Sequence, residues 1–296
     1  MSLQVTIGTA PCSWGVFWAD GTPSRTPYNV FLDQAAQAGY KTLELGPVGY
    51  LPTDPGRLRD ELDSRGLSIC GGTACYNFLK AASFADLRAD VDDICKRLLA
   101  FDVHYLMTMD ENAMGPEEKA KLKEEQARTY AIFGEMGRYC RDAYGVEILM
   151  HPERRSLIET REELERLMDL GLSLCYDNGH YAAANGGWER GDPCSLEFFE
   201  TYAEHIPYLH FKNVSPAVRK VELEEVLAAD DPRQDQMMCP LEDGVIDYKA
   251  YRDLLDRLNF RGVGIIEQDC PNAASEEAFA LAKQNLNYLQ RIGMTD

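Results

Sequence analysis

Four short apolar runs in the sequence end in polar side chains that could bind a metal ion and transfer protons. Each run contributes one pair: His151 and Glu153, Asp177 and His180, His210 and Lys212, and Glu267 and Asp269. Three of the five histidines in the chain belong to these pairs, and the other two are expected to be structural. Carboxylate oxygens and imidazole nitrogens from separate segments are ligands of divalent cations. The pattern therefore predicts a metal site with open positions for a substrate.

A polyol ketone is the substrate class that such a site would suit. A divalent cation can hold two adjacent oxygens of this substrate and act as a Lewis acid on its carbonyl group. The neighbouring C–H then becomes acidic, and a side-chain base can remove the proton to leave an enediolate that the metal stabilises. Return of the proton gives isomerisation or epimerisation, whereas loss of a β-hydroxyl gives dehydration. The shape of the pocket decides among these three reactions.

A repeating unit positions these pairs, and it consists of a short apolar run, a polar loop and an amphipathic stretch. Strands are predicted over 5–9, 42–45, 67–71, 104–108, 146–150, 172–176, 208–211 and 262–266. Alternating strands and helices with nearly continuous apolar strands indicate a parallel sheet covered on both faces. Eight units of about 37 residues favour a closed (β/α)8 TIM barrel, in which the loops after the strands build the active site.

An open doubly wound sheet is the alternative fold. It is disfavoured because no Gly-x-Gly-x-x-Gly motif follows the first strand and no P-loop is present. We expect one barrel domain over residues 1–296, with a polar loop insertion at about 215–242 that contains a helical piece. Asn178 and Gly179 are expected to form a tight turn after the sixth strand. Helices are predicted over 27–38, 55–65, 84–100, 116–144, 160–170, 195–204, 247–258 and 275–291.

The overall charge and composition limit the partners of the protein. The net charge is −19, which disfavours nucleic acid and anionic membranes as partners. No apolar run is long enough to cross a bilayer and no signal pattern opens the chain, so we expect a soluble cytoplasmic protein. The nine cysteines are scattered, which indicates reduced thiols rather than disulfides or a zinc cluster.

Several motifs resemble one known family over most of the chain. They are residues 7–15, with Trp14 and Gly15, residues 39–47, with Glu44, and the segments 151–153, 177–180, 210–213, 242–248 and 267–269. Together they resemble the xylose-isomerase-like TIM barrels of sugar isomerases, epimerases and dehydratases. Within that family the resemblance is closest to inosose dehydratases and related inositol-catabolism proteins.

The resemblance implies a metal held by residues from four strands. It assigns Asp177, His210 and Glu267 as ligands, and counting back from the helix cap at Thr160 places His151 at the fourth position. Inosose dehydratases have His-Pro-His where this chain has 151–153, so Glu153 replaces a histidine near the substrate and is the alternative fourth ligand. The implied ion is Mn²⁺ or Co²⁺, with Mg²⁺ or Zn²⁺ as alternatives.

Further roles follow for residues around the expected metal. Glu153 and Glu267 are both candidates for the catalytic base, Lys212 can reach a substrate oxygen, and His180 can orient a hydroxyl group or a ligand. Three residues are assigned to substrate binding, with Trp14 as an apolar wall for a ring face and Arg155 as a contact for an anionic group: Trp14, Glu44 and Arg155.

These observations predict a lyase that dehydrates a cyclic polyol ketone such as 2-keto-myo-inositol (an inosose) in inositol catabolism. The first alternative is a sugar or inosose isomerase or epimerase on the same scaffold. The second alternative is a sugar-binding barrel without turnover, which the exchange at Glu153 keeps open. The expected partner is a small polyol or sugar, and a homo-oligomer is a further expectation.

Overall fold

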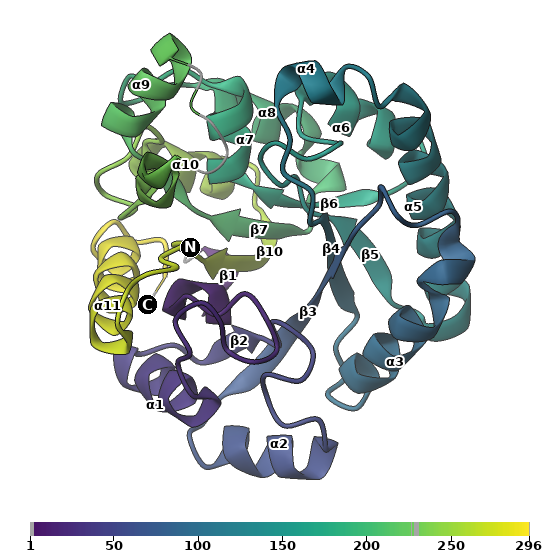
Figure 1. Ribbon diagram of the computed structural model, residues 1–296. Helices are drawn as coiled ribbons and strands as arrows, with labels where there is room; N and C mark the ends of the chain where they lie inside the picture. The colour runs from purple at the N-terminus through teal and green to yellow at the C-terminus, as the bar shows by residue number, and fades with distance from the viewer. Residues whose placement is uncertain (1–2, 226, 228–230, 296) are drawn as a thin grey trace.

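Parallel strands close into a barrel in the computed structural model, which describes residues 3–225, 227 and 231–295. The order around the barrel is β1-β10-β7-β6-β5-β4-β3-β2 (Figure 1). The predicted (β/α)8 barrel is thus confirmed. Its strands are β1 (Gln4–Thr9), β2 (Thr42–Glu44), β3 (Ser68–Tyr76), β4 (Tyr105–Asp110), β5 (Glu147–Met150), β6 (Ser173–Asp177), β7 (Tyr208–Phe211) and β10 (Arg261–Ile266).

Helices form the outer layer around these strands, as Figure 1 shows. Two predicted helices are interrupted. The one expected at 84–100 begins with a separate 3-10 turn at 84–86, and the one expected at 116–144 breaks near Leu122, whose φ of −100° and ψ of 38° are not helical. The main helices are α1 (Tyr28–Ala38), α2 (Pro55–Asp63), α3 (Arg88–Leu99), α4 (Pro116–Lys119), α5 (Lys123–Tyr144), α6 (Arg161–Met168), α8 (Cys194–Tyr202), α10 (Tyr248–Arg257) and α11 (Ser275–Arg291). Among the described residues, no helix combines the length and apolar character needed to span a membrane.

The segment expected as a loop insertion at 215–242 carries structure of its own. It contains α9 (Pro216–Glu225) and a 3-10 turn at 232–236, while residues 226 and 228–230 lie outside the described part. Its end returns to the barrel, because β9 (Met238–Cys239) pairs antiparallel with β8 (Asn213–Val214) directly after β7. The buried Asn213 side chain donates to the carbonyl groups of Leu241 and Ile246, so it ties the C-terminal end of the segment and the residues that follow it to the strand.

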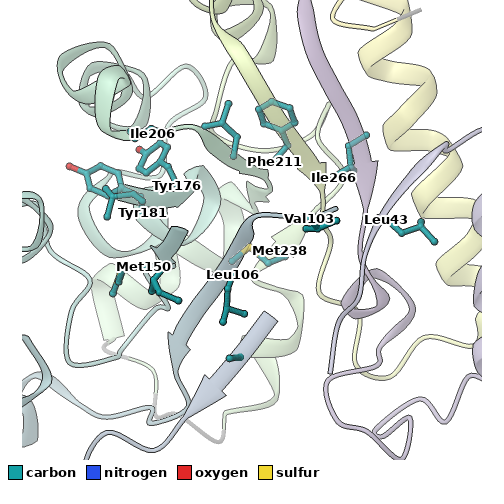
Figure 2. Close-up of a cluster of buried hydrophobic side chains, with 14 of the residues drawn as sticks. Leu43, Val103, Leu106, Met150, Tyr176, Tyr181, Ile206, Phe211, Met238 and Ile266 are labelled. Carbon is teal, nitrogen blue, oxygen red and sulfur yellow. The ribbon is translucent and has the colours of Figure 1, made fainter. Parts of the chain in front are cut away.

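Strand β7 illustrates how alternation divides the side chains between the two layers. Phe211 points outward, because its ring contacts Tyr248 and Tyr251 of α10. Figure 2 shows Phe211 in this outer layer with its partner on β10, Ile266. Tyr208 instead belongs to a small cluster inside the barrel. Since successive side chains of a strand face opposite sides, His210 shares the inner face with Tyr208.

The helix cap at Thr160 gives a stability prediction. The Thr160 hydroxyl accepts from the Glu163 backbone N–H, and the Glu163 carboxylate accepts from the Thr160 N–H, which forms the predicted capping box. Replacing Thr160 by Ala should cost about 1 kcal/mol of unfolding free energy and lower the melting temperature by about 2–4 °C. Circular dichroism melting checks this, with Thr201→Ala on the exposed face of α8 as the control. An unchanged melting temperature would contradict the assignment of this cap.

Candidate metal centre and active site

Four side chains from the ends of four strands meet inside the barrel. One ligand atom from each of His151, Asp177, His210 and Glu267 lies within 4.8 Å of the others, and all four residues are buried. They follow or end β5, β6, β7 and β10, which are consecutive in the barrel. The structure therefore brings together all four residues expected to bind metal, close enough that they could hold a shared cation.

Asp177 occupies its place because it ends a strand and begins a helix. Its Oδ1 accepts the backbone N–H of His180 at 2.7 Å, so Asp177 caps α7 (Asn178–Asn185). The tight turn expected at Asn178 and Gly179 is thus wrong, since these residues form the first turn of this helix. Asp is a strong N-cap, and Gly179 allows close packing because a Cβ there would lie 2.4 Å from the Cβ of Lys212. The other oxygen, Oδ2 of Asp177, faces Nε2 of His151 at 3.3 Å and Nδ1 of His210 at 3.8 Å.

The electrostatics of the group keep its carboxylates charged. Nζ of Lys212 lies 3.1 Å from Oδ2 of Asp177, 2.9 Å from Oε2 of Glu267 and 3.2 Å from Oδ2 of Asp269. Burial alone would raise the pKa of Asp177, but Lys212 and the nearby imidazoles hold this pKa well below its usual range. The pKa of Glu267 is likewise held well below its usual range, because His210 and Lys212 outweigh the effect of burial. Both side chains are therefore ready to accept a cation.

The donor set fits a divalent cation. Its two imidazoles and two carboxylates combine nitrogen and oxygen ligands, which suits Mn²⁺, Co²⁺ and Zn²⁺ better than Mg²⁺. Nδ1 of His210 faces Glu267 Oε2 at 3.1 Å, yet it makes no hydrogen bond with any described residue. A buried nitrogen without such a partner is uncommon, and a metal ion would satisfy it.

Glu153 lies beside this group without belonging to it. Its side chain is 32% exposed, and its carboxylate is 3.1 Å from Nδ1 of His180 and 3.8 Å from Nδ1 of His151. Of the two residues considered for the fourth ligand position, the geometry thus brings His151 into the group. The Glu153 carboxylate, paired with His180, lines the cavity beside the group. The adjacent charge of Glu153 also counteracts burial, so the pKa of His180 is raised from its usual value.

A cavity of about 730 Å³ is lined by three of these four residues, namely His151, His210 and Glu267. Its polar part includes Glu153, Lys212 and Asp269 together with His151, His210 and Glu267. The apolar part comes from the loop after β1 and the segment after β2, and it includes residues that the sequence analysis did not single out: Cys12, Val16, Phe17, Trp18, Pro47 and Val48. The aromatic pair Phe17 and Trp18 in the loop after β1 could have indicated this apolar side of the cavity, since loops after barrel strands line the active site.

The expectation that Trp14 forms a wall of the substrate site is wrong. Trp14 is fully buried, its Nε1 donates to Oε1 of Gln34 at 2.7 Å, and its ring packs edge-on against Phe31 at 4.9 Å. It therefore belongs to the core between the barrel and α1. Trp18, four residues later, is 51% exposed and lines the cavity instead.

Arg155 and Glu44, the other residues expected to bind substrate, have protein partners. The Arg155 guanidinium contacts Glu222 at 3.1 Å and donates to the carbonyl oxygen of Leu227 beside a smaller cavity. Arg155 does not line the main cavity, and its contact with an anionic group stays a prediction. Glu44 does line the main cavity, but its Oε1 accepts from Nε2 of His210 at 2.8 Å.

The comparison with protein families agrees with this architecture. Residues 32–292 match the family described as xylose isomerase-like TIM barrel. The chain belongs to this family. The buried group of His151, Asp177, His210 and Glu267 thus lies at one mouth of a xylose isomerase-like barrel.

The chain is also similar to individual proteins over nearly its whole length. It is 26% identical to an inosose dehydratase of Geobacillus kaustophilus (strain HTA426) over 303 residues, which cover 97% of this chain and 94% of the relative. Among solved structures it is similar to the IolI protein with a bound zinc atom, with a TM-score of 0.70 and 13% identity over 97% of this chain and 98% of that chain. It is also similar to D-allulose 3-epimerase from Methylomonas sp. in complex with D-allulose, with a TM-score of 0.63 and 16% identity over 98% and 99% of the two chains.

Proposed function

We propose that this protein dehydrates a cyclic polyol ketone such as 2-keto-myo-inositol. The observation that carries the proposal is the group of His151, Asp177, His210 and Glu267 beside a cavity that is also lined by the partly exposed carboxylate of Glu153. The relative from Geobacillus kaustophilus, an inosose dehydratase that aligns over nearly the whole chain, supports the same reaction class.

A divalent cation held by His151, Asp177, His210 and Glu267 would supply Lewis acidity at the substrate carbonyl. We expect Mn²⁺ or Co²⁺ to be the working ion, and the similar IolI protein has a bound zinc atom. Mg²⁺ prefers oxygen ligands and should bind this mixed set weakly.

The neighbouring side chains account for the proton transfers. Glu153 accepts the proton from the carbon next to the carbonyl, since it is partly exposed to the cavity. His180, whose Nδ1 lies 3.1 Å from Glu153, is the donor of a proton to the departing hydroxyl in this proposal. The C–O bond then breaks and water leaves, so the two transfers balance. Lys212, within 3.0 Å of Nε2 of His180, donates to a substrate oxygen.

An isomerase or epimerase is the second candidate, favoured by the similarity to D-allulose 3-epimerase. Purified protein incubated with Mn²⁺ or Co²⁺ and 2-keto-myo-inositol distinguishes the candidates. New ultraviolet absorbance from an enolised dione supports dehydration. A new polyol without this absorbance would establish isomerisation or epimerisation, and unchanged substrate despite bound metal would indicate a sugar-binding barrel without turnover.

The apolar side of the cavity gives a prediction for substrate binding. Backbone N–H groups of Phe17 and Trp18 both donate to the Thr22 carbonyl oxygen, at 2.9 and 3.3 Å, so a short turn fixes the backbone at Trp18. The aromatic ring of Trp18 lines the cavity and can pack on the C–H face of a cyclic substrate. Trp18→Ala should raise KM for 2-keto-myo-inositol about three- to tenfold with a small change in kcat.

Tryptophan fluorescence checks the same contact directly. Substrate should change the fluorescence emission of the wild-type protein. Trp188→Phe is the control and should show the same change, because Trp188 is 38% exposed but does not line the cavity. The change should disappear in Trp18→Phe. A substrate-dependent signal that survives in Trp18→Phe would show that this ring does not contact the substrate.

A further inference from the structure

A contact across the barrel interior joins Glu44 of β2 to His210 of β7. Oε1 of Glu44 lies 2.8 Å from Nε2 of His210, and each side chain is at most 2% exposed. Two strands, β1 and β10, separate β2 from β7 around the barrel wall, so the two side chains meet through the interior. The pair is thus created by closure of the barrel.

The Glu44 carboxylate has both oxygens engaged by the protein. Oε1 accepts from His210, and Oε2 accepts from the Thr73 hydroxyl of β3 at 3.2 Å. A carboxylate in such a buried position is costly for stability unless it is paired, and replacing such a pair by apolar groups is often neutral or stabilising. Since stability alone does not favour a buried carboxylate at this position, the presence of Glu44 beside the four-ligand group indicates a role in the site.

The chemistry of imidazole defines this role. A neutral imidazole carries one N–H, and the nitrogen without hydrogen has the lone pair that a metal requires. When Nε2–H donates to Glu44, the lone pair must lie on Nδ1. Nδ1 of His210 is 3.1 Å from Glu267 and 3.8 Å from Asp177, both members of the ligand group, and it forms no hydrogen bond within the described part of the chain.

We infer that Glu44 is a positioning residue, which holds the His210 ring by its Nε2–H and directs Nδ1 to the metal. This inference rests on the proposed metal site. It adds to that site an outer partner, which is a residue that accepts a hydrogen bond from the ring nitrogen of a metal-binding histidine that faces away from the metal. It also replaces the substrate contact expected for Glu44. Outer partners of metal-binding histidines typically contribute about 10- to 100-fold to metal affinity.

Co²⁺ binding to the purified full-length protein, stripped of metal, tests the inference without measuring turnover. Equilibrium dialysis gives the affinity, and the visible absorption spectrum of the bound Co²⁺ reports on its ligand geometry. Glu44→Ala should weaken Co²⁺ binding about 10- to 100-fold and alter the spectrum. Glu44→Gln is nearly isosteric and keeps an oxygen that accepts from Nε2–H, so it should restore most of the affinity and the wild-type spectrum.

The control is Asp110→Asn. Asp110 is another buried carboxylate that lines the cavity, but it accepts from Asn112 and from the Leu157 backbone N–H. Its replacement should leave Co²⁺ affinity unchanged. Wild-type affinity and spectrum in folded Glu44→Ala, or equal losses in Glu44→Ala and Asp110→Asn, would overturn the inference and leave the metal site standing. Failure of the wild-type protein to bind Co²⁺ would overturn both the proposed site and this inference.

Discussion

Asp177→Asn is expected to remove nearly all bound divalent cation from the protein and, with it, turnover. The change replaces one carboxylate oxygen by an amide and removes a negative charge from the group of four ligands. Loss of an outer partner alone costs about 10- to 100-fold in affinity. Loss of a direct ligand should therefore weaken metal binding by at least about 100-fold.

Asn is a particularly informative replacement at this position. Asp177 also caps α7 through Oδ1, and Asn is about as good an N-cap as Asp. The fold should thus survive while the metal is lost, which circular dichroism and elemental analysis after dialysis can establish together. Asp247→Asn is the matched control, because Asp247 caps α10 in the same way and lies outside the ligand group. Full metal content in Asp177→Asn would contradict the ligand assignment.

Glu153→Gln is expected to lower kcat by about 10²- to 10⁴-fold, the range typical for removal of a general base. Metal content should stay unchanged, since Glu153 lies outside the four-ligand group. KM should change little, because Gln keeps the size of the side chain and an oxygen that can accept from Nδ1 of His180. The loss should therefore fall on the proton-transfer step.

Exchange of the substrate C–H in D₂O, followed by proton NMR, isolates that step. The exchange should be nearly abolished in Glu153→Gln. Glu111→Gln is the control, as Glu111 lines the same cavity and accepts from Nδ2 of Asn77. Exchange at the wild-type rate in Glu153→Gln would move the role of base to another carboxylate, such as Glu267. Loss of metal from this variant would instead make Glu153 a ligand.

The ends of the apolar strands were predictable from the chain itself. Runs such as 172–176 and 208–211 are apolar at nearly every position, as expected for strands covered on both faces, and each is followed by a charged residue. In a parallel barrel all strand ends of one kind lie at the same mouth. Strand periodicity and barrel closure therefore predict that the four polar pairs gather at one mouth of the barrel, whereas the family resemblance singled out Asp177, His210 and Glu267 among them.

The sequence alone could not choose between neighbours only a few residues apart. His151 and Glu153 lie on the same segment, and the path of the chain after β5 decides which side chain enters the ligand group. Trp14 and Trp18 share one loop, yet the first is in the core and the second lines the cavity. These choices depend on the course of loops, which period-2 alternation does not describe.

The local sequence 177–180 and the position of Glu44 show the same difference between what the residue types predict and what the tertiary structure decides. Asn178-Gly179 favours a turn by composition, but the capping oxygen of Asp177 and close packing against Lys212 favour a helix. Glu44 meets His210 from 166 positions away in the sequence. Residue types and their periodicity thus determined the barrel and its set of donors. Only the closed tertiary structure decided which donors meet, because contacts across the interior depend on how all the strands are arranged around it.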